Sequence, residues 1–344
     1  MMAALQKAVL FSLVTCAGLV CLNSAHAQDS LRQCAAIRAD AERLACYDSL
    51  TKSMDTQAMQ NPPDSSTARP AMSRPQPGGS QLAQAWELDA GSKTGTFAIT
   101  GHRPMYFLLT QHTDAINTAP TSPAPGRSAT APTRYDATEA KYQISAKTKA
   151  LENIVGSDVD LWLAYTQQSN WQLYNPSGSA PFRETDYEPE VILTVPINRD
   201  LLGVNLRMIN FGFSHQSNGR ANPLSRSWNR LYAQIGLERG NFMLMARPWW
   251  RVLEARSRDD NPDIYDYMGN GDVLAVYRSG AHVVSALARY SFAGHRGGFE
   301  ADWAFPISGP LKGYVRAFNG YGENLLDYNH RQTTIGAGVA ISTW

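Results

Sequence analysis

Alternation of apolar and polar residues along unusually long segments is the feature that most constrains how this chain folds. Residues 228–239 carry an apolar side chain at every odd position from Leu231 to Leu237, with polar or small residues between them. The same period of two runs through 204–217 and 331–343. Because successive side chains of a strand point to opposite faces, each segment has one apolar face and one polar or small face.

Turn sequences divide the region from residue 97 onward into twelve such segments. We expect strands at 97–109, 138–149, 158–170, 189–198, 204–217, 228–239, 241–254, 272–279, 281–292, 298–306, 311–319 and 331–343. Strands of about ten or more residues suit a tilted membrane span better than the typical soluble strand of about 5–6. Plentiful Trp and Tyr and a charged fraction of only 18% are also typical of a membrane barrel. The sequence therefore predicts an all-β fold, a twelve-stranded antiparallel transmembrane β-barrel, with a periplasmic β-sandwich as the alternative because its core strands share the same period.

The charge balance and the lack of long apolar runs exclude two classes of protein. Lys plus Arg number 31 and Asp plus Glu 30, a net charge of +1, which excludes a nucleic-acid binder that relies on a basic surface. Beyond the first 27 residues the sequence has no apolar run of about 18 residues, the usual length of a spanning helix. Any membrane span is therefore expected to be a strand.

Residues 1–27 have the pattern of a cleaved signal peptide. Lys7 precedes a mostly apolar run, and small residues up to Ala27 form a cleavage site. Such a segment directs export, so we expect the barrel in the cell outer membrane.

The residues that follow predict two further parts before the barrel domain, which we place at 86–344. In 28–50, a short helical stretch, Cys34 and Cys46 are expected to form a disulfide, which an exported chain permits. Residues 51–85 are rich in Pro, Ser, Gln and Met and predict a flexible linker. The barrel is thus expected to carry a small Cys-clamped helical N-terminal extension.

Three polar residues interrupt the apolar rows at the end of one expected hairpin. His215 and Ser217 are two residues apart in one strand, so their side chains share a face with Cα atoms about 6.5–7 Å apart. A turn centred near residue 222 pairs His215 with Asn229, and cross-strand partners have Cβ atoms about 4.5–5.5 Å apart. All three residues continue the apolar rows, so we expect them to face lipid rather than the barrel interior.

This cluster has two interpretations. One is a hydrogen-bonded polar cluster near the membrane edge, since polar groups facing lipid are costly unless they are paired or lie near the interface. The other is an acyl-transfer triad with Ser217 as nucleophile, His215 as general base and later acid, and Asn229 orienting the imidazole. On this face a triad meets the acyl esters of lipids.

At these residues the sequence resembles the outer-membrane phospholipase A family. The matching motifs are Tyr165-Thr-Gln167-Gln-Ser169, Trp171-Gln-Leu-Tyr174-Asn, Pro181-Phe-Arg-Glu-Thr-Asp-Tyr-Glu-Pro189, His215-Gln-Ser-Asn-Gly-Arg220, Ser225-Arg-Ser-Trp-Asn-Arg-Leu-Tyr232, Asp260-Asn-Pro-Asp263 and Tyr321-Gly-Glu-Asn-Leu-Leu-Asp-Tyr-Asn329. The resemblance implies a twelve-stranded outer-membrane barrel. It also implies calcium-dependent phospholipase A1 and A2 activity, the hydrolysis of phospholipid acyl esters at either glycerol position by the triad above.

The resemblance further implies a calcium ion (Ca2+) beside the triad, at the interface of a homodimer that is active while the monomer is dormant. The protein ligands carried over are the backbone carbonyl of Arg220, the side chain of Ser225, and the backbone carbonyl of Ser179 from the other subunit. Hard oxygen ligands of this kind suit calcium, with waters completing the shell. Two of those waters and the Gly219 N–H would stabilise the oxyanion. Gln167 would hydrogen-bond across the dimer interface.

Two of these implications stay open in the sequence. A second calcium position in the family uses carboxylates from nearby loops; Asp260 is retained here, but Asn222 stands where an acidic residue is expected. Gln167 shares the outward face with Leu163 and Tyr165, so it also fits an ordinary surface glutamine near the membrane boundary.

Two other functions remain compatible with a barrel. One is a catalytically inactive barrel that acts as a porin-like channel or structural anchor, and the other is an adhesin that uses its outer loops. The Pro-rich residues 118–133 predict a long mobile loop, to which the sequence assigns no function. Twelve strands leave little room inside. Polar residues predicted to pair across a closed interior are Arg230, Glu238, Glu300, Asp302 and Arg316.

Overall fold

The computed structural model describes residues 37–39, 42–43, 45–46, 48–49, 79–255 and 257–344. The chain divides into two units, Met1–Met72 and Ser73–Trp344, and the fold described below is that of the second. The predicted signal peptide lies outside the described residues. Cys46 is disulfide-bonded. Cys34 lies outside the described residues, so the pairing of these two cysteines stays a prediction.

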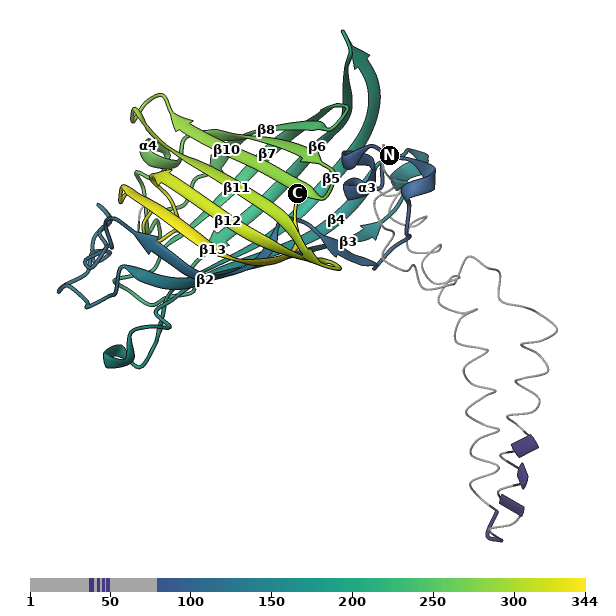
Figure 1. Ribbon diagram of the computed structural model, residues 1–344, viewed down its shortest axis with the longest axis horizontal. Helices are drawn as coiled ribbons and strands as arrows, with labels where there is room; N and C mark the ends of the chain where they lie inside the picture. The colour runs from purple at the N-terminus through teal and green to yellow at the C-terminus, as the bar shows by residue number, and fades with distance from the viewer. Residues whose placement is uncertain (1–36, 40–41, 44, 47, 50–78, 256) are drawn as a thin grey trace, which may run out of the picture. The chain divides into compact units, whose positions relative to one another are not determined.

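Antiparallel strands make up most of the second unit. Their bounds are β1 Ile99–Gly101, β2 Met105–Thr113, β3 Thr138–Leu151, β4 Asp160–Trp171, β5 Phe182–Leu201, β6 Val204–Ser217, β7 Ser227–Arg239, β8 Phe242–Val252, β9 Gly271–Ser279, β10 His282–Ser291, β11 Arg296–Ser308, β12 Leu311–Gly320 and β13 Gln332–Ser342. Strands β2 to β13 form a closed ring, because each pairs with the next and β13 pairs back with β2 (Figure 1). The short β1 pairs with β3 beside β2. The predicted twelve-stranded barrel is confirmed.

The side chains of the barrel are arranged in the reverse of a soluble core. Large apolar side chains exposed on the outside include Leu163, Val191, Phe211, Leu231 and Ile335. Polar and charged side chains buried inside include Lys141, Lys149, Arg183, Glu190 and Asn210. A sandwich would bury the apolar row instead, so this arrangement distinguishes the membrane barrel from the sandwich alternative.

Two predicted strands differ from the observed bounds by more than two residues. The predicted strand 97–109 is split into β1 and β2, because Pro104 has no N–H to donate to the ladder. The predicted strand 189–198 begins seven residues earlier, at Phe182. Its first residues are strongly charged and read as a loop, but in the barrel their inward side chains are buried and paired.

Helices are few in the described part of the second unit. They are α3 Gln81–Trp86 and α4 Tyr265–Met268, with 3-10 turns η2 Ala90–Ser92, η3 Ile154–Gly156 and η4 Pro176–Gly178. Within the described residues, no helix has the length and apolar character needed to cross a membrane.

Helix α3 corrects the predicted linker at 51–85, whose last five residues lie in it. The Ser80 hydroxyl accepts a hydrogen bond from the first turn of the helix. The Leu82 N–H donates to Glu238 Oε1 at 2.7 Å, which attaches the helix to the inner wall of β7. Leu82 and Trp86 are buried, and burial of these apolar side chains is what orders the segment.

The two ends of the barrel differ in the length of their loops. At one end lie the loops 114–137, 172–181, 218–226, 253–270 and 321–331. At the other, two-residue turns such as 202–203 and 240–241 join the strands. Outer-membrane barrels have short periplasmic turns and longer outer loops, so the end that carries His215 and Ser217 corresponds to the outer side.

Ion pairs fill the barrel interior, as the sequence predicted. The N–O pairs are Arg230–Glu188 at 2.6 Å, Arg207–Glu238 at 3.6 Å, Arg316–Asp302 at 3.9 Å and the close pair Arg316–Glu300. All five predicted interior residues therefore have charged partners, with Glu188 and Arg207 added by the structure. A buried charge needs such a partner because desolvation is otherwise costly.

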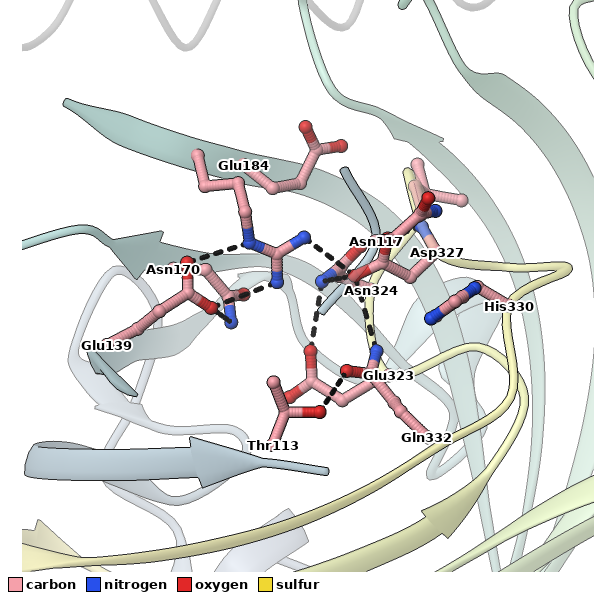
Figure 2. Close-up of polar contacts among 12 residues, drawn as sticks. Thr113, Asn117, Glu139, Asn170, Glu184, Glu323, Asn324, Asp327, His330 and Gln332 are labelled. Atoms are coloured by element: carbon pink, nitrogen blue, oxygen red, sulfur yellow. Dashed lines mark hydrogen bonds and ion pairs between the residues drawn. The ribbon is translucent and has the colours of Figure 1, made fainter. Parts of the chain in front are cut away.

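A second polar network fills the long-loop end of the barrel. Arg183 Nε lies 2.7 Å from Glu139 Oε1, and its Nη1 lies 2.7 Å from Asp327 Oδ2. Asn117 Nδ2 donates to Asp327 Oδ1 at 3.0 Å. In Figure 2, Glu139 and Asp327 lie on opposite sides of this network, with Asn117 near Asp327, because Arg183 bridges the two carboxylates. These contacts occupy the mouth and argue against the porin-like alternative.

Candidate active site

The β6–β7 hairpin brings His215 and Asn229 together in the predicted register. The two residues are direct cross-strand partners. His215 Nδ1 lies 2.8 Å from Asn229 Oδ1. Because an amide oxygen only accepts, Nδ1 must carry the proton. Nε2 is then the free ring nitrogen, which is the tautomer that a general base requires.

Ser217 lies two residues beyond His215, on the same face of β6. It pairs with Ser227 on one side and with Tyr187 of β5 on the other, and it is half-buried. Among the described residues, no hydrogen bond joins Ser217 to His215. Contacts between a nucleophile and its base are often loose without substrate and shorten when it binds.

This cluster faces outward, as predicted. Phe213 precedes His215 on the same face and Leu231 follows Asn229, and both are exposed apolar side chains. The alternate positions Ser214 and Arg230 are buried inside the barrel. The polar cluster therefore continues the lipid-facing row at the point where β6 and β7 reach the loops.

Gly219 follows Ser217 in a conformation that favours glycine. Its φ is +62°, in the left-handed region, and a Cβ placed there would lie 3.2 Å from Tyr187 Cε2. Among the described residues, the Gly219 N–H has no hydrogen-bond acceptor. This donor is therefore available close to the Ser217 hydroxyl.

Asn218 holds the 218–226 turn, a role that the sequence did not reveal. Its side chain is buried; Nδ2 donates to Glu184 Oε1 and to the Leu224 carbonyl, both at 2.8 Å. Its Oδ1 accepts from the Arg226 N–H at 2.9 Å. Burial lowers the pKa of Arg226. The Asn218 side chain thus fixes the backbone that carries Gly219.

The predicted calcium ligands lie in two loops of this end. Arg220 and Ser225 belong to the 218–226 turn, directly after the triad strand, and Ser179 lies in the 172–181 loop with φ +60°. Ser225 Oγ donates to Asp260 Oδ2 at 2.6 Å, which leaves the lone pairs of the hydroxyl oxygen free to bind a cation. Within the described residues, no three His, Cys, Asp or Glu side chains cluster in a way that could hold a metal.

Both carboxylate oxygens of Asp260 accept hydrogen bonds. Its Oδ1 accepts from Arg127 Nε at 2.5 Å, in addition to the Ser225 contact at Oδ2. Ser122 Oγ donates to the Asp260 carbonyl at 2.6 Å. The loop 114–137, in which the sequence predicted a long mobile segment, is thus tied to the 253–270 loop. With Asn222 also lacking a charge, this donor set does not fit a second calcium ion.

Gln167 lies on the outward face of β4, as predicted. Its Oε1 accepts from the Tyr165 hydroxyl at 3.1 Å, and its Nε2 donates to the Tyr142 hydroxyl at 3.2 Å. Tyr165 and Leu163 are exposed on the same face. Within one chain, the glutamine therefore belongs to a polar patch in an apolar surface.

A carboxylate that the sequence did not single out also contacts the triad. Glu254, just beyond β8, accepts a hydrogen bond from Asn229 Nδ2 at 2.8 Å. A signal was present, because β7 and β8 pair Asn229 with Val252, and Glu254 is two positions further on the same face.

Comparison with known proteins agrees with this geometry. A model of the family described as Phospholipase A1 matches residues 82–341. A protein of Neisseria meningitidis serogroup B, named as a candidate phospholipase A1, is 39% identical over 358 residues, which cover 94% of this chain and 93% of that protein.

Two solved structures are similar to this chain over most of the barrel. Outer membrane phospholipase A from Escherichia coli, in an active-site mutant with an asparagine replaced by alanine, is 35% identical with a TM-score of 0.64, covering 73% of this chain and 94% of that chain. The outer membrane phospholipase of Salmonella typhi, a dimer with bound calcium, is 33% identical with a TM-score of 0.66, covering 77% of this chain and 98% of that chain.

Proposed function

The chain belongs to the phospholipase A1 family of outer-membrane phospholipases, and from this premise we propose that it cleaves glycerophospholipid acyl esters with Ser217, His215 and Asn229. The observation that carries the proposal is the 2.8 Å contact between His215 Nδ1 and Asn229 Oδ1, two residues from Ser217 on the lipid-facing surface. Substrate esters lie in the membrane beside that surface, at the two acylated glycerol positions whose cleavage defines A1 and A2 activity.

The proposed reaction has two halves. Ser217 Oγ attacks the ester carbonyl while His215 Nε2 takes the hydroxyl proton. The tetrahedral intermediate then collapses, the ester C–O bond breaks, and His215 returns the proton to the departing lysophospholipid alcohol. In the second half, water attacks the acyl-serine, with His215 again as base, and a fatty acid leaves.

The oxyanion of each intermediate needs a donor that is in place beforehand. We assign the Gly219 N–H to this role, because its left-handed backbone sets its direction and no acceptor among the described residues competes for it. Asn229 is neutral, so it orients the imidazole and stabilises the imidazolium less than a carboxylate would.

The residues present fit one calcium ion beside this site. The Arg220 carbonyl, the Ser225 hydroxyl and the Ser179 carbonyl of a second copy would hold it, all of them hard oxygen ligands. Bound there, calcium would add positive charge where the oxyanion forms. The Ser225–Asp260 hydrogen bond of 2.6 Å orients one of these ligands.

Dimerisation is the proposed control. One calcium ligand comes from a second copy, so a monomer has an incomplete site and is dormant. The Salmonella typhi relative is a dimer with bound calcium, which supports this part of the proposal. Gln167, within an apolar outward face, is the candidate for a polar contact between the copies.

The first experiment measures fatty-acid release from phospholipid micelles by the refolded protein, with calcium and with chelator. We expect calcium-dependent release that is lost in Ser217→Ala. Ser279→Ala, an exposed serine at the other end of the barrel, is the matched control and is expected to behave as wild type. Equal release by Ser217→Ala and Ser279→Ala would refute the triad.

A further inference from the structure

We infer that Glu254 is a fourth member of the catalytic array, a positioning residue that fixes the orientation of the Asn229 amide and through it the tautomer of His215. The inference deepens the proposed function and rests on it. Its basis is the hydrogen bond from Asn229 Nδ2 to Glu254 Oε1 at 2.8 Å, on the opposite side of the amide from the His215 contact.

An asparagine side chain alone does not define which tautomer its histidine partner adopts. Its amide presents an acceptor on one side and a donor on the other, and rotation by half a turn exchanges them. With Oδ1 toward His215, Nδ1 carries the proton and Nε2 is a base. With Nδ2 toward His215, Nδ1 becomes the acceptor, Nε2 carries the proton, and the ring cannot take a proton from Ser217.

Glu254 removes this ambiguity because a carboxylate only accepts hydrogen bonds. It binds Nδ2 and repels Oδ1, so the Asn229 amide has one favourable orientation. That orientation is the one in which Oδ1 faces His215. A triad Asp needs no such partner, since both of its oxygens accept.

The position of Glu254 in the barrel suits this role. The β7–β8 register places Val252 opposite Asn229, and Glu254 lies two residues beyond Val252, just after β8 ends, where it contacts Asn229. Diagonal neighbours of this kind lie about 7–8 Å apart at Cα, within reach of a glutamate side chain. Glu254 is half-buried, and Asn229 is its hydrogen-bond partner among the described residues.

The negative charge of Glu254 adds a second effect. Asn229 lies between this carboxylate and the imidazole of His215. The negative charge favours the imidazolium that forms when Ser217 loses its proton.

The test compares Glu254→Ala and Glu254→Gln with Asp266→Asn, an exposed carboxylate in the same 253–270 loop, in full-length refolded protein. Glu254→Ala is expected to lower kcat by roughly 10-fold or more, with little change in KM. Glu254→Gln no longer favours one orientation of the Asn229 amide over the other, because a glutamine side chain both donates and accepts hydrogen bonds. It is expected to lower kcat with little change in KM, whereas Asp266→Asn leaves both unchanged.

Testing the same substitution in a protein that already carries Asn229→Asp distinguishes a positioning role of Glu254 from a merely structural one. In Asn229→Asp, the new carboxylate faces that of Glu254, so adding Glu254→Gln supplies a donor and is expected to raise kcat at least about threefold. The same substitution thus lowers activity beside Asn229 and raises it beside an aspartate. A loss of loop structure would lower activity in both backgrounds.

The outcomes are distinct. If Ser217→Ala is inactive but both Glu254 variants match Asp266→Asn in kcat and KM, the inference is overturned and the proposed function stands. If Glu254→Gln lowers kcat equally in both backgrounds, Glu254 is structural and the inference is again overturned. If Ser217→Ala retains activity, the proposed function fails and the inference with it.

Discussion

Replacing Gly219 with alanine tests the proposed oxyanion donor through the backbone itself. The residue has a φ of +62°, where an L side chain costs roughly 1–2 kcal/mol. The new Cβ would also lie 3.2 Å from Tyr187 Cε2, closer than a comfortable contact. Rotation of φ to a negative value relieves both, because residue 219 is itself exposed, while the Asn218 side chain holds the rest of the turn.

That relaxation turns the Gly219 N–H away from the position where the oxyanion forms. Loss of one such donor typically lowers kcat by about 10²–10³-fold. The donor acts on the transition state, so KM is expected to change little. We therefore expect Gly219→Ala to lower kcat by about 10²-fold, while the barrel loses at most about 2 kcal/mol of stability.

The assay is steady-state release of fatty acid from phospholipid micelles at saturating calcium, with urea unfolding in detergent as the stability measurement. Gly203→Ala is the matched control, because Gly203 has a φ of +84° and open space around its Cβ, at the opposite end of the barrel. It carries similar backbone strain without touching the site. Wild-type turnover by Gly219→Ala would refute the oxyanion assignment, and equal losses in both variants would show that strain alone is responsible.

Three other substitutions probe the loops and the barrel end. Ser225→Ala is expected to raise the calcium concentration for half-maximal activity by at least about tenfold, and an unchanged midpoint in a calcium titration would exclude this ligand. Arg127→Ala breaks the contact with Asp260 and is expected to speed protease cleavage within 114–137. Arg134→Ala replaces an exposed arginine of the same loop and is expected to leave the cleavage rate unchanged. Equal cleavage rates in the two variants would contradict the anchoring role of Arg127. Trp86→Ala leaves a cavity beside α3 and is expected to cost about 3–5 kcal/mol in urea unfolding, and a loss below about 1 kcal/mol would mean that α3 is not part of the stable barrel.

The period of two in the sequence determined the strands and the register of the site. The β6 bounds are those predicted, and β7 begins one residue earlier than expected. A slip of one residue would move an entire apolar row into the polar interior, so the pattern permits only one pairing face. Counting across the turn then paired His215 with Asn229, as the structure shows.

The same pattern did not predict the start of β5, where charged residues face the barrel interior. The start of β5 carries Arg183, Glu184, Asp186 and Glu188, and such a run resembles a loop when it is read alone. In the barrel, Arg183 pairs with Glu139 and Asp327, residues that lie far away along the chain. Burial of these charges depends on partners that only the closed ring supplies.

Tertiary structure alone decided which side chains support the triad. Asn218 holds its turn through Glu184 of β5, Arg127 reaches Asp260 from a distant loop, and Glu254 reaches Asn229 from the next hairpin. Alternation assigns each residue to a face, and a short turn sets the register of one hairpin, but neither shows which side chains form hydrogen bonds or which loops meet. Those neighbours are set by barrel closure and loop conformation, because a hydrogen bond needs a donor and acceptor within about 3 Å, whatever their separation in sequence.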